Sequence, residues 1–142
     1  MRMMAEDAFQ RFKDEISEAV SKTLKELNVE TDIVIDKAPH GMGDLAFPCF
    51  PLAKKLKKSP DAIAKDIASR IKPEDLIERV EAKGGYVNFT VSFDKLAQKA
   101  LDEALSKKER FGTPDKKKGA RVLLEHTSVN PTGPIHVGRA RN

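Results

Sequence analysis

The segment IERVEAKGGYVNFTVSF, residues 77–93, constrains the fold more than any other part of the chain. Gly84 and Gly85 separate two runs, and the second, YVNFTVSF, is rich in β-branched and aromatic residues. Both glycines can adopt a positive φ, which the tight turns of two-residue hairpins require. After the turn, apolar and polar side chains alternate, as in a strand that is buried on one face. The predicted core face carries Val87, Phe89, Val91 and Phe93, and the predicted solvent face carries Tyr86, Asn88, Thr90 and Ser92.

Helical periodicity on both sides of this hairpin predicts the helices of an α+β domain. Apolar residues recur every three or four positions from Phe9 to Leu27, which indicates one amphipathic helix. Ser59 and Pro60 are typical of an N-cap and a first helical position, so a helix is expected to begin there, after a short basic helix at 52–58. A last helix, about 94–108, is expected to bury Leu96, Ala97, Ala100, Leu101, Ala104 and Leu105.

Residues 29–51 carry two further patterns. VETDIVID, at 29–36, places Val29, Thr31, Ile33 and Ile35 on one face of a predicted strand. KAPHGMGDLAFPCFP, at 37–51, is rich in glycine and proline and predicts an ordered loop with apolar anchors.

The composition changes in KKERFGTPDKKKGARVLLEH. There Gly112, Pro114 and Gly119 bracket a run of lysines. Such a change is typical of a domain joint. We therefore expect an N-terminal domain at 1–112, a linker at 113–120, and the start of a second domain at 121–142. In that second part RVLLE reads as a fully buried strand. The predicted fold is thus α+β, with helices packed on a small antiparallel sheet, followed by the first strand and helix start of a Rossmann-like α/β domain.

Charge and cysteine content narrow the classes of function. The formal net charge of +4 and the pI near 9.2 permit a polyanionic partner without requiring one. Cys49 is the only cysteine, and the three histidines lack paired metal-ligand spacing, so neither a disulfide nor a zinc site is expected. No apolar run is long enough for a membrane span, and the charged start does not fit a signal peptide. These features indicate a cytoplasmic protein with no membrane partner.

The terminal string EHTSVNPTGPIHVGRARN has the chemistry of a phosphate site. It follows a predicted strand, turns at Pro131 and Gly133, and leads into a helix start, where backbone N–H groups can bind phosphate. His136 could donate to phosphate oxygens, and Gly138 would let a nucleotide approach the backbone closely. Arg139 adds positive charge. The string is neither a P-loop nor a GxGxxG motif.

The same string closely resembles the ATP-site signature of class I aminoacyl-tRNA synthetases, in the form found in arginyl-tRNA synthetases. HGMGDLAFPCFPLAKKL and GGYVNFTV resemble segments of that family's N-terminal added domain, so the resemblance covers nearly the whole chain. One departure is Arg139, which stands where the signature carries a second histidine. Arginine also donates hydrogen bonds to phosphate and keeps its charge at any working pH.

The resemblance implies an arginine–tRNA ligase that uses ATP with Mg²⁺ to form arginyl-adenylate and transfers arginine to tRNA(Arg). It also implies a monomeric full-length enzyme and no adenylate formation by this chain alone, because the family's second ATP loop lies further downstream. Two alternatives stay open: a freestanding RNA-binding module and another nucleotidyltransferase with an HxGH-like site.

Site residues follow from the resemblance by matching position. The implied arginine-binding residues are Glu125, which would face the guanidinium, and Ser128 and Asn130, which would hold the zwitterion. The implied ATP-binding residues are Pro131, Gly133, His136 and Gly138, and the implied catalytic residues are His136, Gly138 and Arg139.

The resemblance also implies that the hairpin contacts the tRNA D-loop. Tyr86 would stack on an unpaired base, Asn88 would pair with a base edge, and Lys83 would meet phosphate. An exposed tyrosine can instead be only a good strand former, and Glu125 can instead pair with a nearby arginine.

Overall fold

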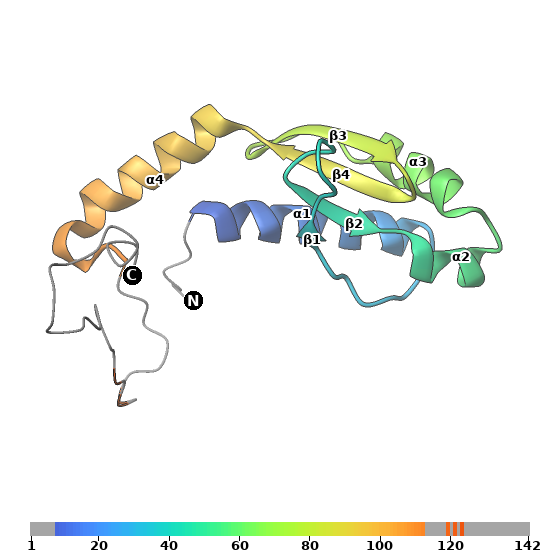
Figure 1. Cartoon of the computed structure of the whole chain (residues 1–142), viewed down its shortest axis with the longest axis horizontal. Coiled ribbons are helices and arrows are strands. Elements are labelled where there is room, and N and C mark those ends of the chain that lie inside the picture. Colours follow the sequence, from blue (N-terminus) through green and yellow to red (C-terminus); the bar gives the residue numbers. More distant parts are fainter. Residues whose placement is uncertain (1–7, 113–118, 120, 122, 124–142) are drawn as a thin grey trace, which may run out of the picture.

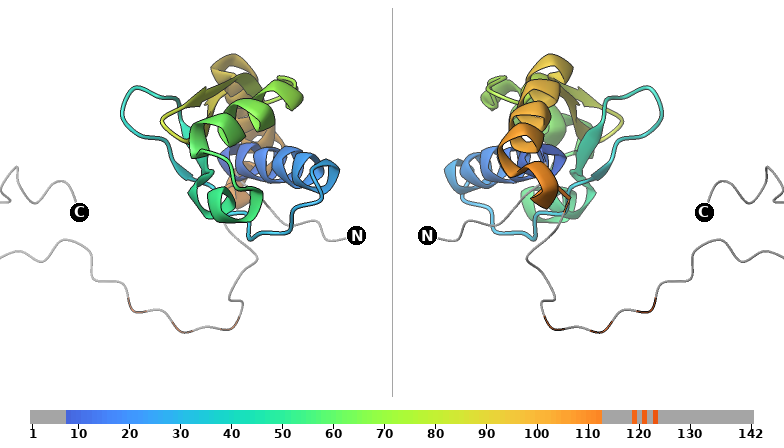
Figure 2. Two further views of the ribbon diagram at one scale, coloured as in Figure 1. Left: turned by 90° about the vertical axis from the view of Figure 1, so that its right-hand side faces the viewer. Right: turned by 90° about the vertical axis from the view of Figure 1, so that its left-hand side faces the viewer.

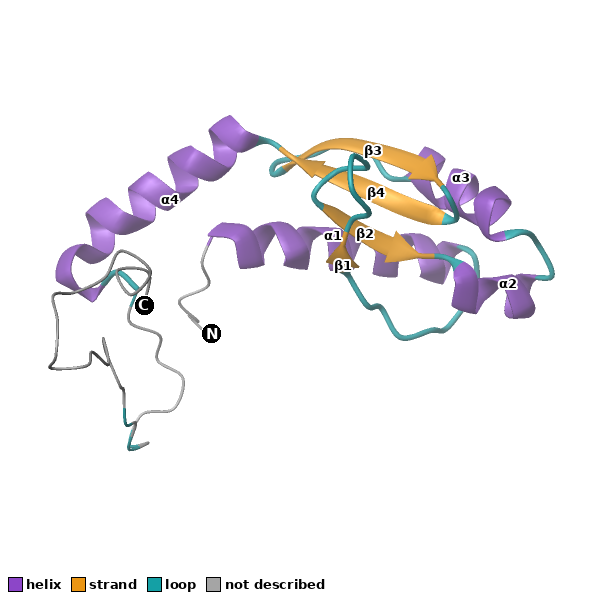
Figure 3. Cartoon of the chain, viewed as in Figure 1, coloured by secondary structure: helices purple, strands orange, loops and turns teal. Residues whose placement is uncertain are grey.

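The computed structural model describes residues 8–112, 119, 121 and 123 of the 142-residue chain. Helices and antiparallel strands are both present, which confirms the predicted α+β class (Figures 1 and 3). The expected Rossmann-like start lies almost entirely outside the described residues. In chain order the elements are α1 (Ala8–Glu26), β1 (Asp36–Lys37), β2 (Leu45–Pro48), α2 (Phe50–Leu56), α3 (Pro60–Arg70), β3 (Ile77–Lys83), β4 (Tyr86–Val91), α4 (Phe93–Lys107) and the 3-10 turn η1 (Lys108–Arg110).

The strands form one sheet in the order β1-β2-β4-β3, and each strand is antiparallel to its neighbours. β3 and β4 are the predicted hairpin, with Lys83 opposite Tyr86. β2 pairs with the other edge of β4, with Phe47 opposite Val87. β4 is therefore a central strand, and its first four residues, 86–89, are paired on both sides.

The expectations for residues 29–51 were partly wrong. Residues 29–35 form no strand, and only Asp36–Lys37 pairs, with the outer edge of β2. The alternating apolar residues instead anchor an extended connection, because Ile35 is buried and Val29 and Ile33 pack against the core. The glycine- and proline-rich stretch expected to be a loop contains β2 and the start of α2.

A single core joins the sheet to the helices on one of its faces. α1 and α3 lie on the same side of the sheet (Figure 2). Burying one aliphatic or aromatic side chain contributes about 1.5–3 kcal/mol, so these contacts dominate the stability of the domain. The buried stripe of α1 is Phe12, Ile16, Val20 and Leu24, each at most 3% exposed. The same core cluster contains Ile63 and Ile67 of α3 and Val87 and Phe89 of β4.

The start of α3 agrees with its sequence signal. The Ser59 side chain accepts a hydrogen bond from the Ala62 N–H at 3.3 Å, and Pro60 is the first helical residue. A side-chain acceptor at this place satisfies one of the N–H groups that a helix leaves free at its N-terminus. Asp61 follows in the first turn, where an acid is favoured by the helix dipole.

α4 begins close to its predicted position, but its burial was predicted wrongly. Leu101 is 59% and Leu105 is 73% exposed, and no residue of the helix is fully buried. The helix leaves the sheet after β4 and extends away from it (Figure 1), so only its first turns reach the core, through Leu96. Amphipathic spacing predicted the helix, yet a partner for its whole apolar face does not exist among the described residues.

A polar junction ties α1 to the start of β3 and to α4. The Glu15 Oε2 atom accepts a hydrogen bond from the Leu76 N–H at 3.0 Å. Lys99 of α4 lies 2.9 Å from Asp75 Oδ2, and this contact holds the pKa of the Asp75 carboxyl below its usual value. Burial raises the pKa of Glu15. The junction thus fixes where α4 departs from the domain.

Leu24, which is buried in α1, and Leu105, which is exposed in α4, provide a matched test of this packing. We expect Leu24→Ala to lower the free energy of unfolding by about 2–5 kcal/mol, because it empties a buried site. Leu105→Ala deletes the same atoms from an exposed helix position and should change stability by no more than about 0.5 kcal/mol. Urea unfolding of the 142-residue chain followed by circular dichroism measures both, and equal losses would contradict the described core.

Cys49 gives a second test, since it is buried beside β4. Burial raises the pKa of its thiol to about 12, so little thiolate exists at neutral pH. Because the thiolate is the reactive form, alkylation of the folded chain at pH 8 should be slower by about tenfold or more than alkylation in concentrated urea. Equal rates in the two conditions would show that Cys49 is not enclosed.

Candidate nucleic-acid interface

The residues expected to bind arginine and ATP are not described by the structure. Their assignments therefore stay predictions. They are Glu125, Ser128, Asn130, Pro131, Gly133, His136, Gly138 and Arg139. The residues expected to contact tRNA, in contrast, all lie in the described hairpin.

The turn between β3 and β4 has the predicted geometry. Gly84 and Gly85 have φ values of +62° and +75°, as a two-residue turn with both central residues left-handed requires. Gly85 is also fixed by packing, since a Cβ atom there would lie 2.9 Å from ring atoms of Phe50 and 3.0 Å from Cβ of Pro60. Gly84 has open space around it, so only its backbone conformation favours glycine.

Tyr86 is the first residue after the turn and forms an aromatic pair with Phe50. Its ring meets the ring of Phe50 edge to face, with centroids 5.1 Å apart and an interplanar angle of 78°. Tyr86 is half-buried and Phe50 is 47% exposed. An edge-to-face contact occupies only one side of a ring system. The pair is thus a supported aromatic surface that solvent can still reach.

Asn88 does not face solvent, contrary to expectation. It is 2% exposed, and its Nδ2 donates long hydrogen bonds of 3.4–3.5 Å to the backbone carbonyls of Glu81, Lys83 and Tyr86. The reason is its place in the central strand, where it stands between Ala46 of β2 and Glu81 of β3. Its Oδ1 atom is buried and has no hydrogen-bond partner among the described residues.

Several lysines lie at this end of the domain. Lys83 is exposed in the turn, and α2, which lies at the same end of the molecule, carries further lysines (Figure 1). One of them is already engaged, because Lys55 Nζ donates to the carbonyl of Glu30 at 2.5 Å. The other exposed lysines on and after α2 are Lys54, Lys57 and Lys58.

Two contacts that sequence reasoning missed hold the turn in place. Asp61 Oδ1 accepts a hydrogen bond from the Gly85 N–H at 2.7 Å, and the Gly85 carbonyl accepts one from the Cys49 N–H at 3.0 Å. In the sequence, Asp61 reads only as a first-turn acid of a helix. Phe50 reads only as an apolar residue beside proline. Neither residue carries a local signal that points to a turn far along the chain.

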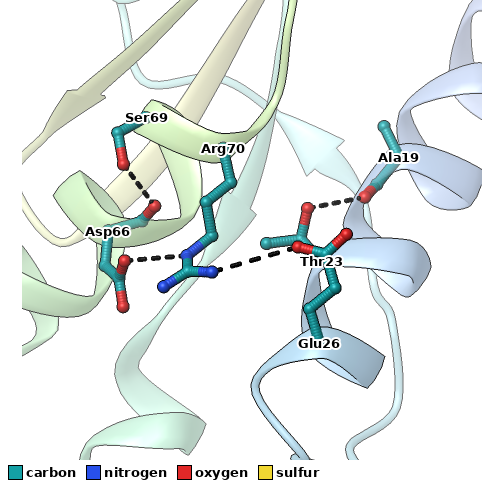
Figure 4. A network of polar contacts seen from close by, with 6 residues as sticks. All are labelled: Ala19, Thr23, Glu26, Asp66, Ser69 and Arg70. Carbon is teal, nitrogen blue, oxygen red and sulfur yellow. Dashed lines mark hydrogen bonds and ion pairs between the residues drawn. The ribbon is translucent and has the colours of Figure 1, made fainter.

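A concave region lies away from the hairpin, between α1, α3 and the start of β3, with a volume of about 630 Å³. Among the charged residues that line it, Arg70 and Glu26 form an ion pair. Arg70 lies 2.9 Å from Asp66 and 3.9 Å from Glu26, so it links α3 to α1 (Figure 4). Within the described part of the chain, no group of acidic, histidine or cysteine side chains could hold a metal ion, and no helix could span a membrane.

Comparison with known proteins agrees with the geometry of the hairpin domain. Residues 10–91 match the family model of the arginyl tRNA synthetase N-terminal domain. The arginine–tRNA ligase of Methanocaldococcus jannaschii is 38% identical over 135 residues, and that of Clostridioides difficile is 39% identical over 134 residues. These matches cover 92% and 93% of this chain but only 24% of each relative.

Among solved structures, the arginyl-tRNA synthetase of Thermus thermophilus matches with a TM-score of 0.58 and 38% identity. The match covers 91% of this chain and 21% of that one. The chain thus spans about a quarter of the length of the relatives it matches. The hairpin, the helices around it and these similarities together show that the chain belongs to the arginyl-tRNA synthetase family and carries that family's N-terminal domain.

Proposed function

We propose that this chain is the tRNA-binding N-terminal part of an arginine–tRNA ligase and that its hairpin end contacts the D-loop of tRNA(Arg). The hairpin end comprises the turn at 83–86 with Asn88, Phe50, and the exposed lysines on and after α2, which are Lys54, Lys57 and Lys58. The observation that carries the proposal is the solvent-accessible Tyr86–Phe50 pair, held at a rigid turn among lysines, in a domain of this family.

Base recognition would begin with stacking on Tyr86. Unpaired bases in RNA loops stack on aromatic rings, and each stacked base contributes about 1–3 kcal/mol. Phe50 supports the Tyr86 ring from one side, so the ring is oriented before RNA arrives. Lys83 and the lysines of α2 would add salt-dependent attraction to the phosphates.

Asn88 would act after the base has entered. A buried acceptor without a donor is unfavourable by about 1–3 kcal/mol, and Asn88 Oδ1 is such an acceptor among the described residues. An exocyclic amino group of a base could supply the missing donor. Because Asn88 is only 2% exposed in the free chain, a base could reach Oδ1 only after a local rearrangement.

The position of the hairpin end fits a contact with a distant part of the tRNA. The turn lies at the opposite end of the domain from α4 (Figure 1), and α4 leads towards residue 112 and the segment that resembles the ATP site. A domain arranged in this way could hold the corner of an RNA while the remainder of a longer enzyme acts on its acceptor end.

The chemistry we propose for the longer enzyme needs no protein nucleophile. Arginine's carboxylate would attack the α-phosphate of ATP and displace pyrophosphate, which gives arginyl-adenylate. A hydroxyl of the terminal ribose of tRNA(Arg) would then attack the arginyl carbonyl and displace AMP. Glu125, Ser128 and Asn130 would hold arginine. His136 and Arg139 would stabilise the charge that develops on phosphate. The ATP turn would be shaped by Pro131, Gly133 and Gly138. Mg²⁺ would accompany ATP. We place this activity in the cytoplasm, where a single reduced Cys49 is expected.

Replacing Tyr86 tests the RNA contact directly. We expect Tyr86→Ala to weaken binding of tRNA(Arg) by about 5- to 100-fold, because a stacking surface is lost. Tyr86→Phe keeps the ring and should bind within about twofold of the parent chain. Fluorescence anisotropy of labelled tRNA at one fixed salt concentration gives both values. If alanine and phenylalanine bind equally well, Tyr86 does not stack on the RNA.

Replacing Glu125 tests the arginine site in a full-length ligase that carries this chain. Glu125→Gln should raise the KM for arginine by about tenfold or more, since a carboxylate pairs with guanidinium through charge-assisted hydrogen bonds. The KM for ATP should stay within about twofold. Glu109→Gln is the matched control, because Glu109 is exposed in η1. An unchanged KM for arginine would remove Glu125 from the site.

A further inference from the structure

We propose that Asp61 is a positioning residue for RNA recognition, which acts by holding the hairpin turn so that Tyr86 is presented in one orientation. The inference rests on the proposed contact between Tyr86 and RNA. It adds a residue from a different helix, one that need not touch the RNA itself.

The contact between Asp61 and the turn is short and specific. The Gly85 N–H donates to Asp61 Oδ1 at 2.7 Å, although the two residues are 24 positions apart in the sequence. A carboxylate acceptor makes a hydrogen bond about twice as strong as a neutral one. The carbonyl of Gly85 is taken by the Cys49 N–H at 3.0 Å. Both polar backbone groups of Gly85 are thus bound to residues outside the hairpin.

Holding Gly85 fixes the residue that follows it. Tyr86 leaves the turn directly after Gly85, and its ring then meets the ring of Phe50. Phe50 and Pro60 also close on Gly85, which leaves no space for a Cβ atom. The backbone before Tyr86 is therefore clamped between the starts of α2 and α3. An aromatic ring that is oriented in advance loses less conformational entropy when a base stacks on it.

Because Asp61 is negatively charged, a positioning role and a purely electrostatic role predict opposite changes in RNA affinity when it is removed. A carboxylate near a phosphate backbone opposes binding, so removing it should strengthen RNA binding if electrostatics alone matter. If Asp61 instead positions the turn, removing it should weaken RNA binding. Asp94 is the matched control, because it is also a first-turn acid, in α4, which begins at the opposite end of β4 from Tyr86.

Binding of tRNA(Arg) by three variants separates these possibilities. We expect Asp61→Ala to weaken binding by about three- to tenfold, despite the loss of a negative charge. Asp61→Asn keeps an oxygen acceptor for the Gly85 N–H and should bind within about threefold of the parent chain. Asp94→Ala has the same change of charge as Asp61→Ala and should bind as well as the parent chain or slightly better. Tighter binding by Asp61→Ala would overturn the inference.

Tyrosine fluorescence supplies a readout that needs no RNA. The chain has one tyrosine and no tryptophan, so its intrinsic emission reports Tyr86 alone. We expect acrylamide to quench this emission more strongly in Asp61→Ala than in the parent chain, in Asp61→Asn or in Asp94→Ala. Equal quenching in all four proteins would show that Asp61 does not hold the turn.

The two measurements also distinguish this inference from the proposed function. If Tyr86→Ala weakens tRNA binding and Asp61→Ala does not, only the role of Asp61 fails. If Asp61→Ala raises quenching but Tyr86→Ala leaves tRNA binding unchanged, the clamp exists and the RNA contact is wrong, so the proposed function fails and the positioning role fails with it.

Discussion

Burial of one face of β4 beneath α1 and α3 is the interaction on which the remaining structure depends. Val87 and Phe89 are fully enclosed in the core, which fixes the register of β4 against β2 and β3. A slip of one residue would move these side chains to the other face and lose several kcal/mol, about 1.5–3 for each. With the register fixed, the turn must fall at Gly84–Gly85, and Tyr86 must leave it beside Phe50. The stability of the core thereby sets the geometry of the proposed RNA contact.

Local sequence patterns were sufficient to predict the elements that residues close together in the chain determine. The glycine pair and the alternation after it predicted the hairpin, and Ser59 with Pro60 predicted the start of α3. The exposure of Asn88 was predicted wrongly, because alternation gives the face of a strand and not its neighbours in the sheet. Leu101 and Leu105 were predicted as buried because amphipathic spacing cannot show whether a partner is present. The clamp on Gly85 joins residues far apart in the chain, so no local pattern contains it.

The two proposed sites differ in what supports them. The ATP and arginine residues rest on the match between the terminal string and a family signature, with Arg139 as a departure from that signature. The proposed RNA contact rests in addition on described geometry, namely the Tyr86–Phe50 pair, the Asn88 Oδ1 atom that has no partner among the described residues, and the nearby exposed lysines. The hairpin end and α4 lie at opposite ends of the domain, so the proposed RNA contact is far from the helix that leads towards residue 112 (Figure 1).

The central claim is that an RNA base stacks on Tyr86, and the intrinsic emission of the single tyrosine tests it most directly. The 142-residue chain would be titrated with tRNA(Arg), and with the same tRNA carrying abasic nucleotides in its D-loop. We expect saturating intact tRNA to quench the emission. The loss should exceed the loss that tRNA absorption alone causes, which a parallel titration of free tyrosine amide measures. The abasic tRNA should quench much less. Emission that is unchanged by saturating intact tRNA would contradict the claim.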